Sequence, residues 1–277
     1  MNRNENAVRF TLLGAAALAT GLSACAGDES APGRLAVQIY GEEFAEEGIP
    51  ADVFADGWTV RFDKVLLSVG DVSAAIEHDE PGLTAPAYRI WDLARPSGGA
   101  GFQVTAGDVD GGPYDHIAYR VAPSADATAG NAAEEDVDLM RGGGFSLYVA
   151  GSAEKEGSSV SFDWGFSGST RYGECEGTAL VDGGEHATTL TIHMDHLFYD
   201  DLFSPEPLVA FALVAQADAD GDQVVTEEEL AAVSLATQER YQVGSTGIAD
   251  LWSFIDQQTS TVGHIDGEGH CGVAERE

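Results

Sequence analysis

Between residues 34 and 200 the chain alternates short apolar runs, rich in β-branched and aromatic residues, with turns rich in Gly, Asp and Pro. The run from Trp58 to Val65 alternates between apolar and polar side chains up to Asp63, with a period of two that is typical of a strand with one buried face. Short strands at this spacing indicate an antiparallel β-sandwich. The predicted strands are 35–40, 58–67, 88–93, 116–121, 144–150, 160–166 and 188–194.

From residue 201 onward the apolar period lengthens to that of a helix. Ser204 and Pro205 read as an N-cap followed by proline at the first helical position. Leu208, Phe211 and Ala215 then share one face. The predicted helices are 205–217, 227–241 and 246–262, the last capped by Ser245.

These patterns predict an α+β protein with a sandwich body at 34–200 and a helical region at 201–277. A hydrophobic fraction of 44% is enough for a folded core. Segments 122–142 and 151–158 are rich in Ala, Gly and Glu and are predicted as loops.

The first 24 residues are predicted to be a signal peptide. Arg3 and Arg9 give a positive start, and the apolar run 10–22 is too short to span a bilayer. We therefore exclude this segment from the fold and expect the protein to be exported.

The ending Leu22-Ser-Ala-Cys25 resembles the lipobox of bacterial lipoproteins. That resemblance implies that Cys25 becomes the lipidated first residue, that 25–33 is a tether, and that a membrane lipid anchor holds the protein. Ala26 after the cysteine resembles outer-membrane sorting; whether the protein faces the periplasm or the medium stays open. An ordinary secretory signal cut near Ala26 is the alternative, which changes anchoring but not export.

With Cys25 assigned to lipid, Cys175 and Cys271 remain, and in an exported chain two cysteines most simply form one disulfide. The alternative, a thiolate metal site or a catalytic cysteine, is less favoured because neither has a partner at two-residue spacing.

The charge is strongly negative, with 13 Lys and Arg against 47 Asp and Glu and a net charge of −34. Such a field disfavours nucleic acid and electrostatic docking on anionic lipid, and favours cations and basic partners. For most of these carboxylates the simplest interpretation is a solvated acidic surface.

One run of oxygen-bearing residues stands out from this acidic background. Ca²⁺ takes six to eight oxygens, and a twelve-residue loop supplies them from positions 1, 3, 5, 7, 9 and 12. In the run 218–229 those positions are Asp218, Asp220, Asp222, Val224 through its carbonyl, Thr226 and Glu229.

This run resembles the calcium loop of the EF-hand family, and the resemblance covers the loop and its flanking helices. It implies a bound Ca²⁺ cofactor and an apolar eighth position, Val225, that normally pairs with a second loop. Thr226 and Glu229 also form a capping-box pattern. Position 6, usually Gly because φ is positive there, is Gln223, which costs on the order of 1 kcal/mol and would weaken the site.

No second loop of this type is visible, so the loop must pack on the third helix, the sandwich or another chain. Asp108-Val-Asp110-Gly echoes it, but position 12 is Tyr119, and we interpret that run as a turn. We expect the ion to be mainly structural, so that removing it loosens residues 200–271 and leaves the strands folded.

A second metal site is a weaker hypothesis. His193 and His196 end the last predicted strand, and His264 lies near the carboxyl end with Asp266 and His270. Imidazoles could hold Zn²⁺ or Cu²⁺, although on a straight strand His193 and His196 face oppositely. Histidines hydrogen-bonded in a structural role are the more favoured interpretation.

No nucleophile elbow or phosphate-binding loop is present, so a non-enzymatic role is expected. Besides the calcium-binding lipoprotein and the transition-metal handling protein, a surface adhesin or carbohydrate-binding module with a protein or glycan partner stays open. That last alternative expects exposed aromatic side chains such as Trp58, Trp91 or Trp164.

Overall fold

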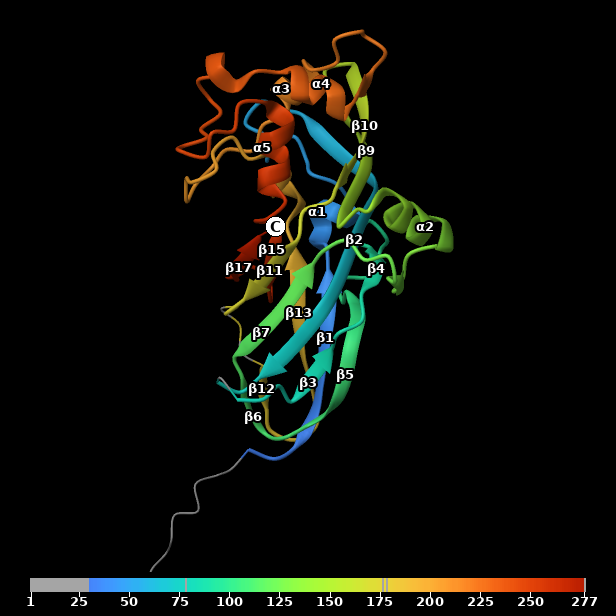
Figure 1. Cartoon of the computed structure of the whole chain (residues 1–277), viewed down its shortest axis with the longest axis vertical. Helices are drawn as coiled ribbons and strands as arrows, with labels where there is room; N and C mark the ends of the chain where they lie inside the picture. Colours follow the sequence, from blue (N-terminus) through green and yellow to red (C-terminus); the bar gives the residue numbers. More distant parts are fainter. Residues whose placement is uncertain (1–29, 78, 176, 178, 277) are drawn as a thin grey trace, which may run out of the picture.

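The computed structural model describes residues 30–276 except 78, 176 and 178 (Figure 1). The predicted signal peptide and the lipidation of Cys25 lie outside these residues. The α+β class and the strand-rich body are confirmed. Among the described residues, no helix is long and apolar enough to cross a membrane.

The smaller sheet has the order β16-β15-β13-β1-β5. Its central pair, β1 and β13, is parallel, and its other pairings are antiparallel. The body is therefore a mixed structure rather than a purely antiparallel one. The strands are β1 (Gly33–Tyr40), β5 (Phe102–Val109), β13 (Glu185–Ile192), β15 (Gly263–Ile265) and β16 (Gly269–His270).

The larger sheet has the order β14-β10-β9-β2-β7-β11-β17, with β3 and β4 on β2 and β8 on β4. A separate ladder pairs β6 with β12. The strands are β2 (Thr59–Ala75), β3 (Leu83–Ala85), β4 (Arg89–Asp92), β6 (Gly112–Tyr114), β7 (His116–Val121), β8 (Thr128–Ala129), β9 (Leu147–Lys155), β10 (Ser158–Phe166), β11 (Thr170–Gly173), β12 (Ala179–Val181), β14 (Val224–Val225) and β17 (Gly272–Arg276).

The long strand β2 organises this larger sheet because it pairs with different neighbours along its length. Register shifts near Phe62 and between Gly70 and Ser73 bend it, so that its first half pairs with β9 and its second half with β7. Asp71, with φ of 50°, sits in the second irregularity. The predicted strand 58–67 is therefore the first half of a longer one.

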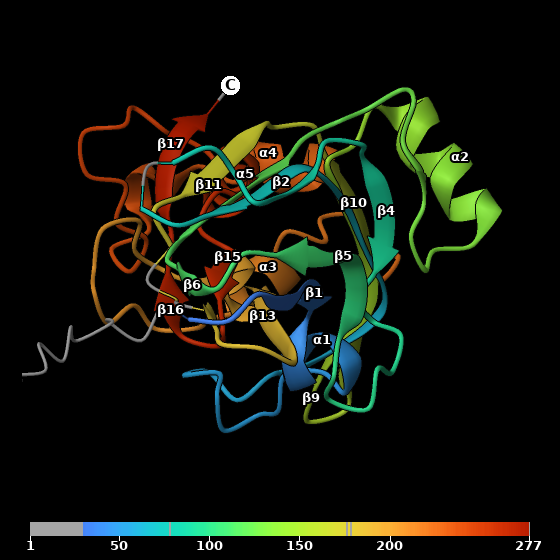
Figure 2. The ribbon, with the colours of Figure 1, turned by 90° about the horizontal axis from the view of Figure 1, so that it is seen from below.

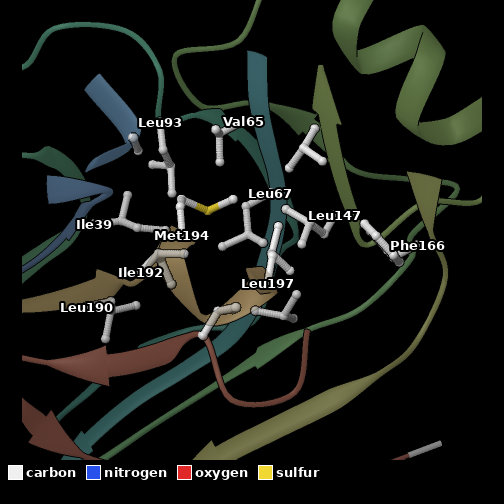
Figure 3. Close-up of a cluster of buried hydrophobic side chains, with 14 of the residues drawn as sticks. Ile39, Val65, Leu67, Leu93, Leu147, Phe166, Leu190, Ile192, Met194 and Leu197 are labelled. Atoms are coloured by element: carbon white, nitrogen blue, oxygen red, sulfur yellow. The ribbon is translucent and has the colours of Figure 1, made fainter. Parts of the chain in front are cut away.

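The core lies where side chains of the two sheets meet (Figure 3). Leu190 and Ile192 of β13 and Met194, which follows β13, lie in one cluster with Val65 and Leu67 of β2, and all five are fully buried. This contact fixes the end of β13, and with it the chain that follows, against the larger sheet.

The helices are shorter than the sequence predicts. Those of the described chain are α1 (Glu42–Glu46), α2 (Glu134–Gly143), α3 (Ala212–Ala215), α4 (Glu227–Ala232), α5 (Leu251–Gln258) and the 3-10 helices η1 (Met194–Phe198) and η2 (Leu235–Thr237). Asp250, not Ser245, caps α5. The interval 122–142, predicted as a loop, contains most of α2, which lies beside β4 (Figure 2).

Residues 201–277 do not form a purely helical region, because strands β14 to β17 join both sheets. The predicted disulfide is confirmed: Cys175 and Cys271 are bonded, 96 residues apart in sequence. The C-terminal segment is therefore tied to the body at several points.

Candidate metal sites

The calcium-type loop lies between α3 and α4, at the edge of the larger sheet beside β10 (Figure 1). Its seventh and eighth residues, Val224 and Val225, form β14 and pair in parallel with Ser161 and Phe162. Val225 is fully buried. The eighth position, which in a paired EF-hand contacts a second loop, is thus satisfied by this chain's own sheet.

The loop brings its first three predicted ligands together. Carboxylate oxygens of Asp218, Asp220 and Asp222 all lie within 4.8 Å of one another. Asp218 accepts hydrogen bonds from the backbone N–H groups of Gly221 at 2.8 Å and Gln223 at 3.1 Å. These bonds hold the turn that points the carboxylates at a common centre.

Glu229, the predicted bidentate ligand, spans the two ends of the loop instead of joining that cluster. Its carboxylate accepts from the Ala219 N–H at 2.9 Å and from the N–H and hydroxyl of Thr226, both at 2.9 Å. Thr226 in return accepts from the Glu229 N–H, which completes the predicted capping box. The N–H donors of Thr226 and Ala219 lower the pKa of Glu229, so the carboxylate stays charged.

The sixth position has the left-handed backbone that the loop requires. Gln223 has φ of 70°, and Gly221 at position 4 has φ of 77°. A glycine therefore occupies one of these left-handed positions, while the other is filled by a residue with a Cβ atom.

Contacts other than a metal ion also hold this region on the sheet. The Trp164 indole N–H donates to the Val225 carbonyl at 2.9 Å. Phe211, just before α3, packs against Trp58 with ring centroids 5.3 Å apart. A carboxylate oxygen of Asp56 accepts from the N–H groups of Phe211 and the next residue. These contacts attach the region to the body whether or not the loop holds an ion.

The three histidines that the sequence singled out lie together on a different part of the fold. His193 follows β13, His196 is on η1, and His264 is on β15. One ring nitrogen of each lies within 4.8 Å of the others. The exposed fractions of the side chains are 8%, 8% and 6%. The His193 and His264 rings stack at 4.2 Å.

Acidic side chains surround this cluster, and sequence reasoning missed one of them. A carboxylate oxygen of Glu42, on α1, lies 3.6 Å from His193 Nε2. Asp195 is half-buried, and this burial raises its pKa. Burial also raises the pKa of Glu42, while His193 lowers it. Only the packing of α1 against η1 brings Glu42 here, so no local pattern could have revealed it.

The tryptophans expected to be exposed in an adhesin are buried: Trp58, Trp91 and Trp164 are 7%, 3% and 1% exposed. Of the run that was predicted to be a turn, Asp108 lies in β5 and Asp110 lies in the connection from β5 to β6.

Comparison of the chain with protein-family models, with curated proteins and with solved structures gives no match. The functional argument therefore rests on these two clusters of side chains.

Proposed function

We propose that this protein is an exported, non-enzymatic calcium-binding lipoprotein, in which Ca²⁺ is mainly structural and closes the loop 218–229 against the edge of β10. The observation that carries the proposal is the convergence of Asp218, Asp220 and Asp222, whose oxygens lie within 4.8 Å of one another. Carboxylates this close repel one another, and a divalent cation converts that repulsion into attraction.

The loop supports calcium specifically because its donors are all oxygen. Carboxylates, a hydroxyl and a backbone carbonyl are the ligands of a hard cation such as Ca²⁺. An extracellular-type site binds with a dissociation constant of about 10⁻⁴ to 10⁻³ M, which is enough for occupancy where calcium is abundant.

The ion has a mechanical consequence through β14. Val224 is both the predicted carbonyl ligand and a residue paired with Ser161 of β10. A cation that holds the aspartates also fixes the strand that follows them, and through Thr226 it fixes the start of α4. We therefore place the effect of calcium on residues 218–232.

The adhesin alternative has little support, because the tryptophans that would form its aromatic platform are in the core. The acidic surface and the calcium loop favour cation binding over glycan binding.

The test is calorimetric titration of Ca²⁺ into wild type and Asp220→Asn, with Asp110→Asn as the matched control. Asp110 is also exposed, lies in a turn, and loses the same charge. Loss of a charged ligand should weaken binding at least about tenfold, a cost of about 1.4 kcal/mol. The control should bind as wild type does.

Hydrogen exchange checks where the ion acts. Ca²⁺ should slow amide exchange in 218–232 in wild type and Asp110→Asn, but not in Asp220→Asn. Equal titrations for all three proteins would show only diffuse binding to the acidic surface and would contradict the proposal.

Lipid anchoring is tested separately by Cys25→Ser expressed in a bacterial host. Wild type should fractionate with membranes and carry acyl groups by mass spectrometry. The variant should lose the acyl groups and leave the membrane fraction; membrane attachment that persists in the variant contradicts the anchor.

A further inference from the structure

The three-histidine cluster is built by a change of backbone at the end of β13. On a continuing strand His193 and His196 would face opposite ways. The strand ends at Ile192, and His193 becomes the N-cap of η1. Side chains three residues apart eclipse in a 3-10 helix, so His196 returns to the side of His193.

The pairing of β15 with β13 places the third histidine, His264, beside the other two. His264 of β15 lies opposite Thr191 of β13 in the antiparallel register. Its ring is 4.2 Å from that of His193 and 5.1 Å from that of His196, centroid to centroid. Two chain segments about 70 residues apart in sequence therefore place three imidazoles close together.

His196 is oriented as a metal-binding histidine would be. Its Nδ1 lies 3.1 Å from the Thr261 hydroxyl oxygen. That hydroxyl donates its own proton to the Gln258 carbonyl at 2.9 Å, so it accepts from the imidazole. A proton on Nδ1 leaves Nε2 with a free lone pair, and such an outer partner is typical of histidines that bind metals.

Burial favours the neutral form of two of these rings, which is the form that binds a metal. Burial lowers the pKa of His196 to about 3, and the nearby His193 contributes to this shift. Burial likewise lowers the pKa of His264 to about 3, with contributions from His193, His196 and His270.

Two buried polar atoms at this point have no hydrogen-bond partner among the described residues: Nδ1 of His264 and Oδ1 of Asp195. Leaving such an atom unsatisfied costs about 1 to 3 kcal/mol. The other Asp195 oxygen accepts from the Tyr199 hydroxyl at 3.1 Å. A cation in the cluster would supply an electrophile to the His264 nitrogen, which has no partner among the described residues.

The cluster is accessible from outside. A pocket of about 460 Å³ is lined by His196, His264, His270 and Glu268 among others. A second pocket, of about 260 Å³, is lined by Glu42, His193, Asp195 and Glu268 among others. An ion can therefore enter, and a position is left for water or a carboxylate.

We propose that His193, His196 and His264 bind one divalent transition-metal ion, Zn²⁺ or Cu²⁺, at a site separate from the calcium loop, with a fourth position that faces these pockets. Imidazole nitrogens suit both ions, whereas Ca²⁺ prefers oxygen. Tetrahedral Zn–N bonds place the nitrogens about 3.3 Å apart. Because the lone pair of an imidazole lies in the plane of its ring, binding requires the stacked rings of His193 and His264 to turn relative to each other.

The test uses the full chain in detergent with excess CaCl₂, into which ZnCl₂ and, separately, CuCl₂ are titrated by calorimetry. One ion should bind per chain with a micromolar or tighter dissociation constant. His196→Gln and His264→Gln should each abolish this step, whereas His186→Gln, at the far end of β13, should not. Co²⁺ should give the visible absorption of a four-coordinate ion in wild type and His186→Gln only.

Two further measurements separate a lost ligand from a lost fold. Thr261→Val removes the acceptor for His196, together with the bond from that hydroxyl to the Gln258 carbonyl, and leaves the three histidines in place. It should weaken Zn²⁺ or Cu²⁺ binding about 10- to 100-fold. Calcium titration of every histidine variant should match wild type, and Asp220→Asn should keep the transition-metal site. The proposal is overturned if neither ion binds, if His196→Gln and His264→Gln still bind like wild type, or if His186→Gln loses binding equally.

Discussion

Gln223→Gly tests whether the sixth loop position stores backbone strain. Gln223 has φ of 70°, a conformation that costs an L-residue about 1 to 2 kcal/mol. Its side chain is exposed, and the contacts of its N–H with Asp218 and of its carbonyl with Ser161 belong to the backbone. Glycine would keep those contacts and relieve the strain. Glycine also loses more conformational entropy on folding, which costs about 0.5 to 1 kcal/mol and offsets part of that gain.

The net expectation is a gain of about 0.5 to 1 kcal/mol in the free energy of unfolding. Because the Asp218 bonds hold this turn without an ion, the gain should appear both with Ca²⁺ and with chelator. The backbone strain is then the same in the calcium-free and the calcium-bound protein, so it cancels in the free energy of binding. The calcium dissociation constant should therefore change less than about twofold. This differs from the expectation, drawn from the sequence, that Gln223 weakens the site.

The assay is urea unfolding, followed by circular dichroism, in Ca²⁺ and in EGTA, together with calcium titration. Gly221→Gln is the reciprocal control: Gly221 has φ of 77° and open space where a Cβ would lie, so its substitution tests conformation alone. It should lose about as much stability as Gln223→Gly gains. A gain in unfolding free energy that appears only in Ca²⁺ would show that the ion creates the turn. No gain in either Ca²⁺ or EGTA would refute the claim that Gln223 is strained.

Two further predictions concern the carboxyl-terminal half. Replacing Cys175 and Cys271 together by Ala should lower the free energy of unfolding by up to about 4.7 kcal/mol, the loop-entropy value for about 100 residues, measured by urea unfolding without reductant. In metal-free protein, acid should destabilise the fold: the pKa of His196 is about 3 when folded and about 6.5 when unfolded, so stability falls by about 1.4 kcal/mol per pH unit below about 6.5. The raised pKa values of Glu42 and Asp195 act oppositely above their ordinary values of 4.5 and 3.8, because there the folded state binds the proton more readily than the unfolded state does. Wild type and His196→Gln are therefore compared over the same range, from pH 7.5 to 5. His196→Gln should show a shallower slope, and equal slopes would contradict the assignment.

Strands were the more predictable elements, because alternation of side chains is a local property. The predicted strand 116–121 coincides with β7, and 160–166 lies within β10. The partners of a strand are not local, so the parallel pairing of β1 with β13 could not be read from either run. β2 continues to Ala75 through an irregularity between Gly70 and Ser73. This irregularity interrupts the alternation, so the sequence pattern does not show that the strand continues.

Helix lengths were overestimated for a related reason. The apolar spacing after Ser204 suggested a helix from Pro205, but α3 begins only at Ala212. Its first N–H groups are bound by Asp56, more than 150 residues earlier in the chain. A cap supplied from so far away leaves no trace in the local sequence, and the intervening segment is free to form bridges with β-type geometry.

Helix α2 shows the opposite error, and here the sequence did contain a usable pattern. Glu134 and Glu135 favour the N-terminus of a helix through its dipole. Val137 and Met140, three residues apart, are the buried face, and Gly144 ends the helix with φ of 66°. The acidic and glycine-rich composition hid a short amphipathic segment that covers the outer side of β4.

The two candidate metal sites differ in predictability because of how far apart their ligands lie in sequence. All the ligands of the calcium loop fall within twelve residues, so spacing alone defines the site. The histidine cluster needs the 3-10 turn after Ile192 and the register that sets His264 opposite Thr191. Their chemistry also separates them: oxygen donors at the exposed loop favour Ca²⁺, and buried imidazoles favour Zn²⁺ or Cu²⁺. Ca²⁺ should therefore not enter the imidazole cluster, whereas Zn²⁺ also binds carboxylates and has to be kept from the loop by excess Ca²⁺.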